Sequence, residues 1–315
     1  MKVLFRFDPG PALQRRLANL SVEGLEIAHC PEGADEDRFF DLLREAEVLW
    51  HVLEPVTAAV LAEAPRLRLI QKIGVGVNTI DLEAAGARGV AVCNMPETNS
   101  QAVAEMTLAL MLAALRRLPA LDRATRHGRG WGLPASIQDD LGEVSGKTVG
   151  LVGYGAVPAR LAPVLRALGA RLLYTARTPK REAVAEWRAL PDLLAESDIV
   201  SLHVPLTPET EQLIDAAAID RMKPGAVLVN TARGGLVDEP ALLAALRGSR
   251  LRAAGLDVFA DEPVAPDNPL LALDNVVLAP HLAWLTMETL ERSLAVALDN
   301  CRRLADGRDL VHRIV

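Results

Sequence analysis

The chain has 315 residues, of which 50% are apolar, 24% are charged and 3% are aromatic, and its formal net charge is −7. This length is typical of two ordinary domains, and the acidic balance argues against a nucleic-acid or membrane partner, whose binding surface would be basic. The three cysteines have no paired spacing, so we predict neither a disulfide framework nor a metal site, and we expect a cytoplasmic protein.

The first hundred residues alternate between strand-like and helix-like patterns. Apolar runs predict strands at 3–7, 25–29, 48–53, 67–73 and 90–93. The segments between them predict helices at 11–20, 35–46, 57–64 and 81–87. Alternation at this spacing indicates βαβ units, and therefore a parallel sheet with helices on both faces.

The next segment, 99–116, is apolar on almost every side, which predicts a helix that is buried all round. It is interpreted either as a core helix between two domains or as a helix that partly meets a second subunit. Residues 119–146 then show no strong periodicity, and such long irregular segments are typical of interaction arms. We therefore expect a homodimer formed through the segment 99–146.

A second α/β unit begins near residue 147. It contains strand-like runs at 149–152, 172–175, 199–203, 227–230, 254–258 and 276–279. Six strands joined by helical crossovers predict a doubly wound nucleotide-binding domain. The last predicted helix, 286–304, follows a complete unit, so we expect it to return and pack on the first domain.

The strand 149–152 leads into a glycine turn and a helix, the context in which a G-x-G-x-x-G pattern marks a dinucleotide site. Gly153 would permit the tight turn, and Gly155 would let a pyrophosphate approach the backbone at the positive end of the helix. Pro158 replaces the third glycine and should be tolerated in the first helical turn, with the helix beginning near Ala156. The predicted cofactor contacts in this turn are Gly153, Tyr154, Gly155, Ala156 and Val157.

Three polar signals follow later strands of this unit. They are Arg233 before a glycine pair, the acidic loop containing Asp257 and Glu262, and His281 after Pro280. Each signal taken alone is more typical of a solvated or structural side chain than of a catalytic one. Together they place a cation, a carboxylate and an imidazole at the strand ends where open α/β sheets bind ligands.

With these motifs in order, the chain resembles the D-isomer-specific 2-hydroxyacid dehydrogenase family over nearly its whole length. The segments that carry the resemblance are 74–81 (GVGVNTID), 102–105 (AVAE), the glycine turn, 230–235 (NTARGG), 255–263 (GLDVFADEP) and 280–281 (PH). The resemblance implies a fold with two doubly wound parallel-sheet domains. A Rossmann coenzyme domain (99–284) would be inserted into a discontinuous, flavodoxin-like substrate domain (1–98 plus 285–315), with the active site in the cleft.

The resemblance also implies roles for individual residues. His281 corresponds to the acid/base that exchanges a proton with the substrate oxygen, and Glu262 to the carboxylate that holds the imidazole. Arg233 corresponds to the cation that grips the substrate carboxylate, for which its planar fork is suited. Asp257 is expected to anchor the nicotinamide amide. Thr231 and Ala232, beside Arg233, are expected to contact the cofactor.

Four residues of the first hundred are expected to bind substrate. Val75 and Gly76 match the family loop whose backbone N–H groups hold the carboxylate. His51 and Lys72 are placed near the cleft by the same resemblance, and a basic residue near Lys72 is typical of phosphoglycerate-dehydrogenase-like relatives.

The segment after the strand 172–175 bears on the choice of cofactor. An NAD enzyme usually carries an Asp or Glu here for the ribose hydroxyl, whereas this chain has Arg177 and Thr178, followed by Lys180 and Arg181. A cation at this point can meet a 2′-phosphate, so NADP(H) is favoured and NAD(H) is the alternative. The competing interpretation is that these are solvated loop charges.

We therefore expect an NAD(P)-dependent oxidoreductase acting on a small anionic 2-keto or 2-hydroxy acid of glyoxylate, hydroxypyruvate or phosphoglycerate type. The alternative is a non-catalytic NAD(P)(H)-sensing protein on the same scaffold. A third interpretation, a formate or phosphite dehydrogenase, is less similar, because formate dehydrogenases pair the histidine with an amide and Glu262 is acidic.

Overall fold

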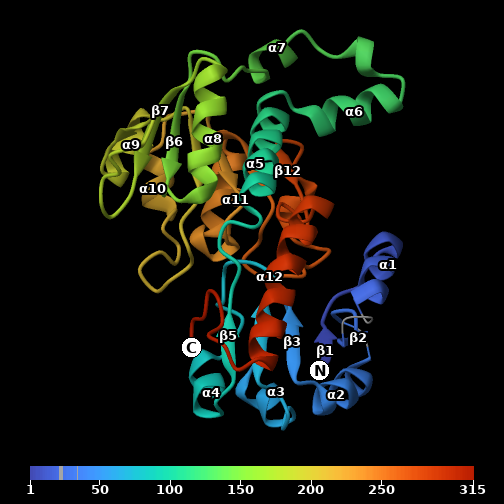
Figure 1. Ribbon diagram of the computed structural model, residues 1–315. Helices are drawn as coiled ribbons and strands as arrows, with labels where there is room; N and C mark the ends of the chain where they lie inside the picture. Colours follow the sequence, from blue (N-terminus) through green and yellow to red (C-terminus); the bar gives the residue numbers. More distant parts are fainter. Residues whose placement is uncertain (21–23, 34) are drawn as a thin grey trace. The chain divides into compact units, whose positions relative to one another are not determined.

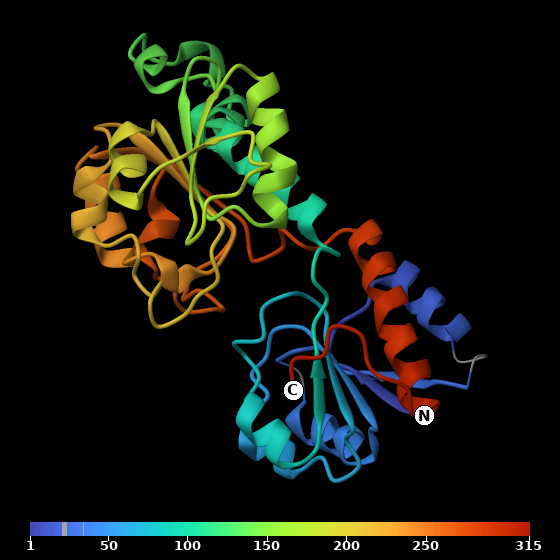
Figure 2. The same cartoon turned by 60° about the vertical axis from the view of Figure 1, so that its left-hand side comes forward.

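The computed structural model describes residues 1–20, 24–33 and 35–315, and its contacts divide the chain into two compact units. The first unit comprises Met1–Asn99 and Thr286–Val315, and the second comprises Ser100–Leu285. Each unit is a parallel sheet flanked by helices (Figures 1 and 2). The prediction of two parallel-sheet α/β domains is therefore confirmed.

The first unit contains five parallel strands among its described residues, in the order β2-β1-β3-β4-β5. The strands are β1 (Lys2–Phe5), β2 (Glu26–His29), β3 (Val48–His51), β4 (Leu69–Lys72) and β5 (Ala91–Cys93). The helices are α1 (Pro11–Leu20), α2 (Glu36–Glu45), α3 (Ala58–Ala62), α4 (Leu82–Ala87) and α12 (Met287–Ala305). The strand order reverses between β1 and β3, and parallel sheets bind ligands beside such a reversal.

Short polar side chains begin several of these helices. Thr57, Asp81 and Thr286 each accept a hydrogen bond from the backbone N–H three residues later. The final helix, α12, returns to the first unit as expected, because the buried amide of Asn300 donates to the Gln71 side-chain oxygen on β4 at 2.7 Å.

The second unit contains seven parallel strands in the order β12-β11-β10-β9-β6-β7-β8. The strands are β6 (Thr148–Val152), β7 (Arg171–Thr175), β8 (Glu186–Trp187), β9 (Ile199–Leu202), β10 (Ala226–Asn230), β11 (Leu251–Leu256) and β12 (Val276–Leu278). Its helices are α5 (Ser100–Leu115), α6 (Leu118–Arg126), α7 (Ile137–Asp140), α8 (Ala156–Ala167), α9 (Leu190–Glu196), α10 (Ala216–Arg221) and α11 (Glu239–Arg247). The order reverses between β6 and β9, as in a dinucleotide-binding sheet.

The strand β8 was not predicted. It is a two-residue edge strand with both residues exposed, so it lacks the apolar run that identifies a strand in sequence. The other strands of this sheet pack between two apolar clusters, one on each side. Of the helices in the described part of the chain, none has the length and apolar character that crossing a bilayer requires.

The helix α5 is buried on one side only. Leu110, Met111 and Leu115 are buried against the sheet and α8, and Met106 and Leu108 pack on the same core as half-buried residues. Gln101, Glu105 and Ala109 on the opposite side are exposed. The prediction of a helix buried all round is therefore wrong for that side of α5.

The segment 119–146 is less irregular than predicted. It contains α6, a 3₁₀ turn at Gly130–Gly132 and the short α7, none of which has a buried residue. The helix α6 is amphipathic, but Gly128, Gly130 and Gly132 directly follow it and interrupt the periodicity of the segment.

Candidate functional site

The glycine turn lies at the carboxyl end of β6, beside the reversal of strand order in the second unit. Gly153 has a φ of +100°, and a Cβ there would lie 2.6 Å from the carbonyl oxygen of His203 after β9. Glycine is therefore needed at this position for both its conformation and its close approach. A Cβ on Gly155 would meet nothing within 4 Å, so the space above the second glycine is open to a ligand.

The helix α8 begins at Ala156, which confirms the predicted start, and Pro158 is its third residue. The first intrahelical bond runs from the Ala159 N–H to the Gly155 carbonyl at 3.1 Å, so Pro158 removes no hydrogen bond. The first-turn N–H groups of α8, among them those of Ala156 and Val157, have no acceptor within the helix. Together with the positive end of the helix dipole they are candidates for binding an anionic pyrophosphate.

The loop after β7 carries the predicted 2′-phosphate contacts. Arg177 and Thr178 are exposed, as are Lys180 and Arg181. Among the residues that the structure describes, none of the three basic side chains has an acidic partner within 4.0 Å. The loop therefore presents three exposed cations, of which Arg177 also lies near enough to Glu209 for its charge to help lower the pKa of that carboxyl.

Arg233 is positioned by a turn at the end of β10. The buried side chain of Asn230 spans this turn, since its amide donates to the Arg233 carbonyl at 2.8 Å and its oxygen accepts from the Ala232 N–H at 3.0 Å. A Cβ on Gly234 would lie 1.8 Å from the Phe259 carbonyl carbon. This glycine therefore lets the Arg233 turn lie directly against the loop that follows β11. Thr231, also in the turn, is buried, and its hydroxyl lies 2.8 Å from that of Thr107 on α5.

Replacing Gly234 with alanine is expected to lower the free energy of unfolding by about 3 kcal/mol, because the added methyl overlaps backbone atoms that cannot rotate away. Gly235 is the matched control, since its Cβ would meet only the Leu206 side chain, at 3.1 Å. Urea denaturation of both variants measures the difference. A Gly234→Ala variant as stable as Gly235→Ala would contradict this account of the turn.

His281 lies in a sharp turn that Asp257 holds. The buried Asp257 carboxylate accepts from the N–H groups of Leu282 and Ala283, each at 2.9 Å, and its carbonyl accepts from the His281 N–H at 2.7 Å. His281 itself has a φ of +56°, a left-handed conformation that is uncommon for a residue with a side chain. Burial raises the pKa of Asp257, whereas the bonds from Ala283 and Leu282 act in the opposite direction. Asp257 thus fixes the position of the imidazole.

The imidazole of His281 is paired with Glu262. Its Nδ1 lies 2.5 Å from the Glu262 Oε2, and the other carboxylate oxygen accepts from the Phe259 N–H at 2.9 Å. Burial alone would raise the pKa of Glu262, but the His281 and Phe259 hydrogen bonds and the charges of His281 and Arg233 hold it below its ordinary value. Glu262 is therefore a carboxylate at neutral pH, and it leaves the Nε2 of His281 to exchange a proton.

Arg233 lies near enough to this pair for its charge and that of Glu262 to act on each other. Burial lowers the pKa of Arg233 from its ordinary value, while the charge of Glu262 acts to raise it. The second unit thus assembles a half-buried guanidinium, a carboxylate and an imidazole from three successive strand ends. A carboxylic acid bound by the guanidinium would have a proton donor and acceptor beside it.

The other predicted substrate contacts lie in the first unit. His51 ends β3 and Lys72 ends β4, where the two residues pair in the sheet. Both are buried, and the ammonium of Lys72 donates to the Val52 carbonyl. Burial and the charge of Lys72 lower the pKa of His51 to about 3, so its ring is neutral at physiological pH.

The loop that contains Val75 and Gly76 follows β4. The Asn94 amide donates to the Val75 carbonyl at 2.9 Å, and the Met95 N–H donates to the Gly74 carbonyl at 2.8 Å. Val75 is exposed. The loop is thus held by its carbonyl groups, which leaves the N–H groups of Val75 and Gly76 as the candidates for binding a carboxylate.

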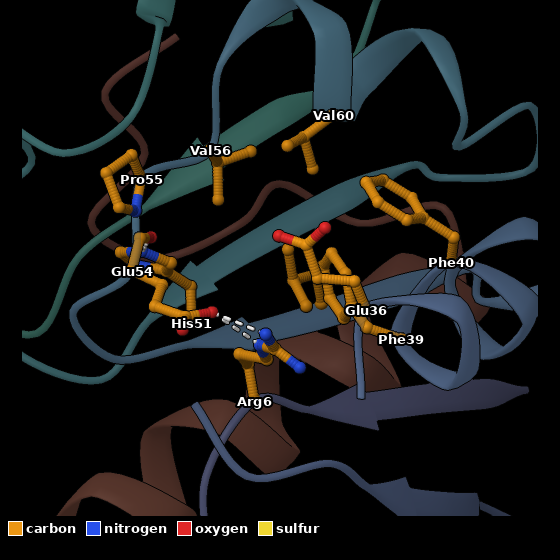
Figure 3. A pocket seen from close by; sticks show the side chains of 10 residues that line it. Arg6, Glu36, Phe39, Phe40, His51, Glu54, Pro55, Val56 and Val60 are labelled. Carbon is orange, nitrogen blue, oxygen red and sulfur yellow. Dashed lines mark hydrogen bonds and ion pairs between the residues drawn. The ribbon is translucent and has the colours of Figure 1, made fainter. Parts of the chain in front are cut away.

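His51 also lines a pocket of about 270 Å³ beside the reversal of strand order in the first unit (Figure 3). Its Nε2 lies 2.6 Å from the Glu54 carbonyl, and the Arg6 Nε donates to the Glu54 Oε2 at 2.8 Å. Lys72 and the Val75–Gly76 loop do not line this pocket. Arg6 and Glu54 were not identified from the sequence as residues of a pocket. Arg6 could have been identified, because it is a cation at the carboxyl end of the strand β1.

Comparison with known proteins bears on what these residues do. Residues 108–283 match the model of the D-isomer specific 2-hydroxyacid dehydrogenase NAD binding domain. The chain is 44% identical over 283 residues to a glyoxylate reductase of Aeropyrum pernix, covering 86% of this chain and 84% of that protein. It is 43% identical over 267 residues to a D-3-phosphoglycerate dehydrogenase of Mycobacterium tuberculosis, covering 83% of this chain and 50% of that protein. The chain thus matches only half the length of that phosphoglycerate dehydrogenase.

The fold of the whole chain is also found in a solved structure. A protein of Thermus thermophilus superposes over the whole of both chains with a TM-score of 0.90 and 38% sequence identity.

Proposed function

Since the chain belongs to the D-isomer-specific 2-hydroxyacid dehydrogenase family, we propose that it interconverts a small 2-keto acid and the corresponding 2-hydroxy acid with NADP(H) as its preferred cofactor. The observation that carries this proposal is the 2.5 Å contact between His281 and Glu262 beside the half-buried Arg233. This set supplies a proton donor and a carboxylate-binding cation on a unit whose strand order is that of a dinucleotide-binding sheet.

The chemistry divides between the cofactor and three side chains. The nicotinamide, when bound, supplies or accepts the hydride at the substrate C2. Arg233 holds the substrate carboxylate and polarises the reacting oxygen, and His281 gives that oxygen its proton from Nε2. Glu262 holds the ring through Nδ1 and stabilises its charged form. In oxidation of the hydroxy acid the proton returns to His281.

The cofactor is held mainly by residues of the second unit, so we assign residues 99–284 as the dinucleotide-binding domain and 1–98 plus 285–315 as the substrate domain. The glycine turn and the start of α8 receive the pyrophosphate. Thr231, Ala232 and Asp257 contact the nicotinamide end, where Asp257 retains lone pairs beyond those that bind the 282–283 backbone.

A small substrate without a phosphate is favoured over a phosphorylated one. His51 is neutral at physiological pH, and the Lys72 ammonium already donates to the Val52 carbonyl. His51 therefore offers no positive charge to a second anionic group, and one of the three donors of the Lys72 ammonium is already used. Val75 and Gly76 would bind the single carboxylate of glyoxylate or hydroxypyruvate through their backbone N–H groups.

The function is tested by steady-state assays of glyoxylate, hydroxypyruvate, pyruvate and 3-phosphohydroxypyruvate with each nicotinamide cofactor. Turnover of the first two at a higher kcat/KM than the phosphorylated acid supports the proposal. The alternative, a non-catalytic nucleotide-sensing protein, is not favoured, because the curated relatives are named as enzymes. Cofactor binding without turnover of any of the four acids would restore it.

The wild-type protein is expected to show a kcat/KM for NADPH about tenfold or more above that for NADH, since a 2′-phosphate gains charge-assisted hydrogen bonds from Arg177 and its neighbours. Arg177→Ala should reduce this ratio by lowering the value for NADPH alone. Arg166→Ala, which removes an exposed arginine from the far end of α8, is the matched control. A wild-type preference for NADH would refute the proposed choice of cofactor.

A homodimer formed through residues 99–146 is also proposed. Trp131 is 90% exposed, Leu118 is exposed, and the amphipathic α6 buries no residue within the chain. Large apolar side chains exposed on one segment are typical of a protein interface when they form a patch.

The protein is expected to sediment as a dimer at micromolar concentration, and Trp131→Asp should raise the dimer dissociation constant about a hundredfold or more, because it places a charge in the interface core. Analytical ultracentrifugation measures both. Trp187→Asp, at another exposed tryptophan outside this segment, serves as the control. A wild-type monomer throughout the micromolar range would contradict the proposal.

A cytoplasmic location is consistent with the cysteines, since Cys30, Cys93 and Cys301 are all buried free thiols.

A further inference from the structure

Both tyrosines of the chain meet beside the glycine turn. Tyr154 lies between the two glycines, Tyr174 lies on β7, and their ring centroids are 4.6 Å apart. The strands β6 and β7 are paired and α8 packs against β7 (Figure 1). In a chain with only 3% aromatic residues, this pairing is a local concentration of rigid side chains.

Each tyrosine hydroxyl binds the backbone of the loop 176–185, which has no helix or strand of its own. The Tyr174 hydroxyl accepts from the Lys180 N–H at 2.7 Å and donates to the Lys180 carbonyl at 3.3 Å. The Tyr154 hydroxyl accepts from the Val184 N–H at 3.2 Å. A third aromatic side chain, Trp187, donates from its indole to the Ala176 carbonyl at 3.1 Å and so joins the two ends of the loop.

This loop is the one that presents Arg177, Lys180 and Arg181 to solvent. Exposed basic side chains on an otherwise unstructured loop would lose conformational entropy on binding an anion. Fixing the backbone at residues 180 and 184 beforehand reduces that cost, because the cations then extend from a settled loop. The Tyr154 bond also joins this loop to the turn that receives the pyrophosphate.

We propose that Tyr154 is a positioning residue for coenzyme discrimination: its hydroxyl holds the loop 176–185 so that the basic side chains meet a 2′-phosphate. The proposal rests on the proposed function, in which this loop binds the adenosine ribose. The tyrosine acts on the 2′-phosphate through the loop, whereas the pyrophosphate is bound by the glycine turn and α8. Loss of the hydroxyl should therefore affect NADPH far more than NADH.

The test is Tyr154→Phe, which keeps the ring and its contact with Tyr174 but removes the bond to Val184. The Kd for NADPH, measured by nucleotide fluorescence, is expected to rise about five- to tenfold, the value of one hydrogen bond, and the Kd for NADH less than twofold. Amide exchange at Val184 should accelerate in the free protein. Equal weakening of both coenzymes, or an unchanged NADPH/NADH ratio with Val184 deprotected, would overturn the proposal.

A double-mutant cycle separates positioning from a general effect on the fold. The quantity compared is the logarithm of the ratio of the Kd for NADPH to the Kd for NADH. When Arg177 is already replaced by alanine, Tyr154→Phe should change this logarithm by less than half as much as it does in the wild-type background. Fully additive effects would overturn the proposal, because they would mean that the tyrosine acts independently of the cation.

Failure of the proposed coenzyme choice is a separate outcome. It would appear as a wild-type preference for NADH, whatever the variant does. In that case the affinities of 2′,5′-ADP and 5′-AMP for the wild type and Tyr154→Phe decide the role of the loop. A selective loss for 2′,5′-ADP supports it, and an equal change in both refutes it.

Discussion

Replacing His281 with alanine is expected to lower kcat/KM for the keto acid by about 10³- to 10⁴-fold, because a positioned acid/base accounts for a rate factor of this order. The Nδ1 of His281 lies 2.5 Å from the Glu262 carboxylate, and the His281 N–H donates to the Asp257 carbonyl at 2.7 Å. These two contacts hold the imidazole in the position that the proposed proton transfer requires. The Kd of the nicotinamide cofactor should change less than twofold. Steady-state kinetics and a fluorescence titration measure the two quantities.

Glu262→Gln is the matched companion of the His281 variant. An amide can still accept a hydrogen bond at Nδ1, but it no longer stabilises the charged ring, so the loss in kcat/KM should be smaller, about 10- to 100-fold. In the wild type the pKa of Glu262 lies below that of an ordinary glutamate. Glu262 therefore stays charged when the pH falls to the pKa of an ordinary glutamate, and it is protonated only at lower pH. The wild-type advantage over Glu262→Gln should therefore persist at mildly acidic pH and disappear in stronger acid. A His281→Ala enzyme with full turnover would refute the assignment.

Most of the fold could be predicted because its strands are central and buried. The strand β6, for example, is buried at every residue and appears in sequence as an apolar run, and Gly153 marks its end. The elements that were missed lie at edges: β8 has two exposed residues, and α6 buries none. A two-residue strand is too short to show an alternating pattern, and the glycine-rich stretch after α6 hides the periodicity of that helix.

The chemical groups of the candidate site could be proposed from the sequence, but the contacts that position them could not. Arg233, Glu262 and His281 were identified from residue type, from strand ends and from a family resemblance. The hydrogen bonds that position these side chains join residues far apart in the chain. An example is the bond that the Ala283 N–H donates to the Asp257 carboxylate at 2.9 Å. The approach of Gly234 to Phe259 and the bond of Tyr154 to Val184 are of the same kind. Spacing along the chain does not encode such contacts.

Arg233→Ala is expected to lower kcat/KM for the keto acid by about 10³-fold. In the proposed mechanism it removes the guanidinium N–H donors that bind the substrate carboxylate and polarise the reacting oxygen. The Arg233 side chain is half-buried, and Asn230 holds its turn by donating to the Arg233 carbonyl and accepting from the Ala232 N–H. Arg233→Lys keeps the charge but loses the planar fork, so it should recover only part of the activity, with a raised KM. Initial rates over a range of keto acid concentrations distinguish kcat from KM.

Two further measurements show whether Arg233 acts on the substrate. Guanidinium added at millimolar concentration should restore part of the Arg233→Ala activity, because the cavity left by the side chain accepts the same planar cation beside Glu262. The same salt should not rescue His281→Ala, whose missing group is a proton donor. If Arg233→Lys were as active as the wild type, a bidentate grip on the carboxylate would be excluded. The charge alone would then account for the role of this residue.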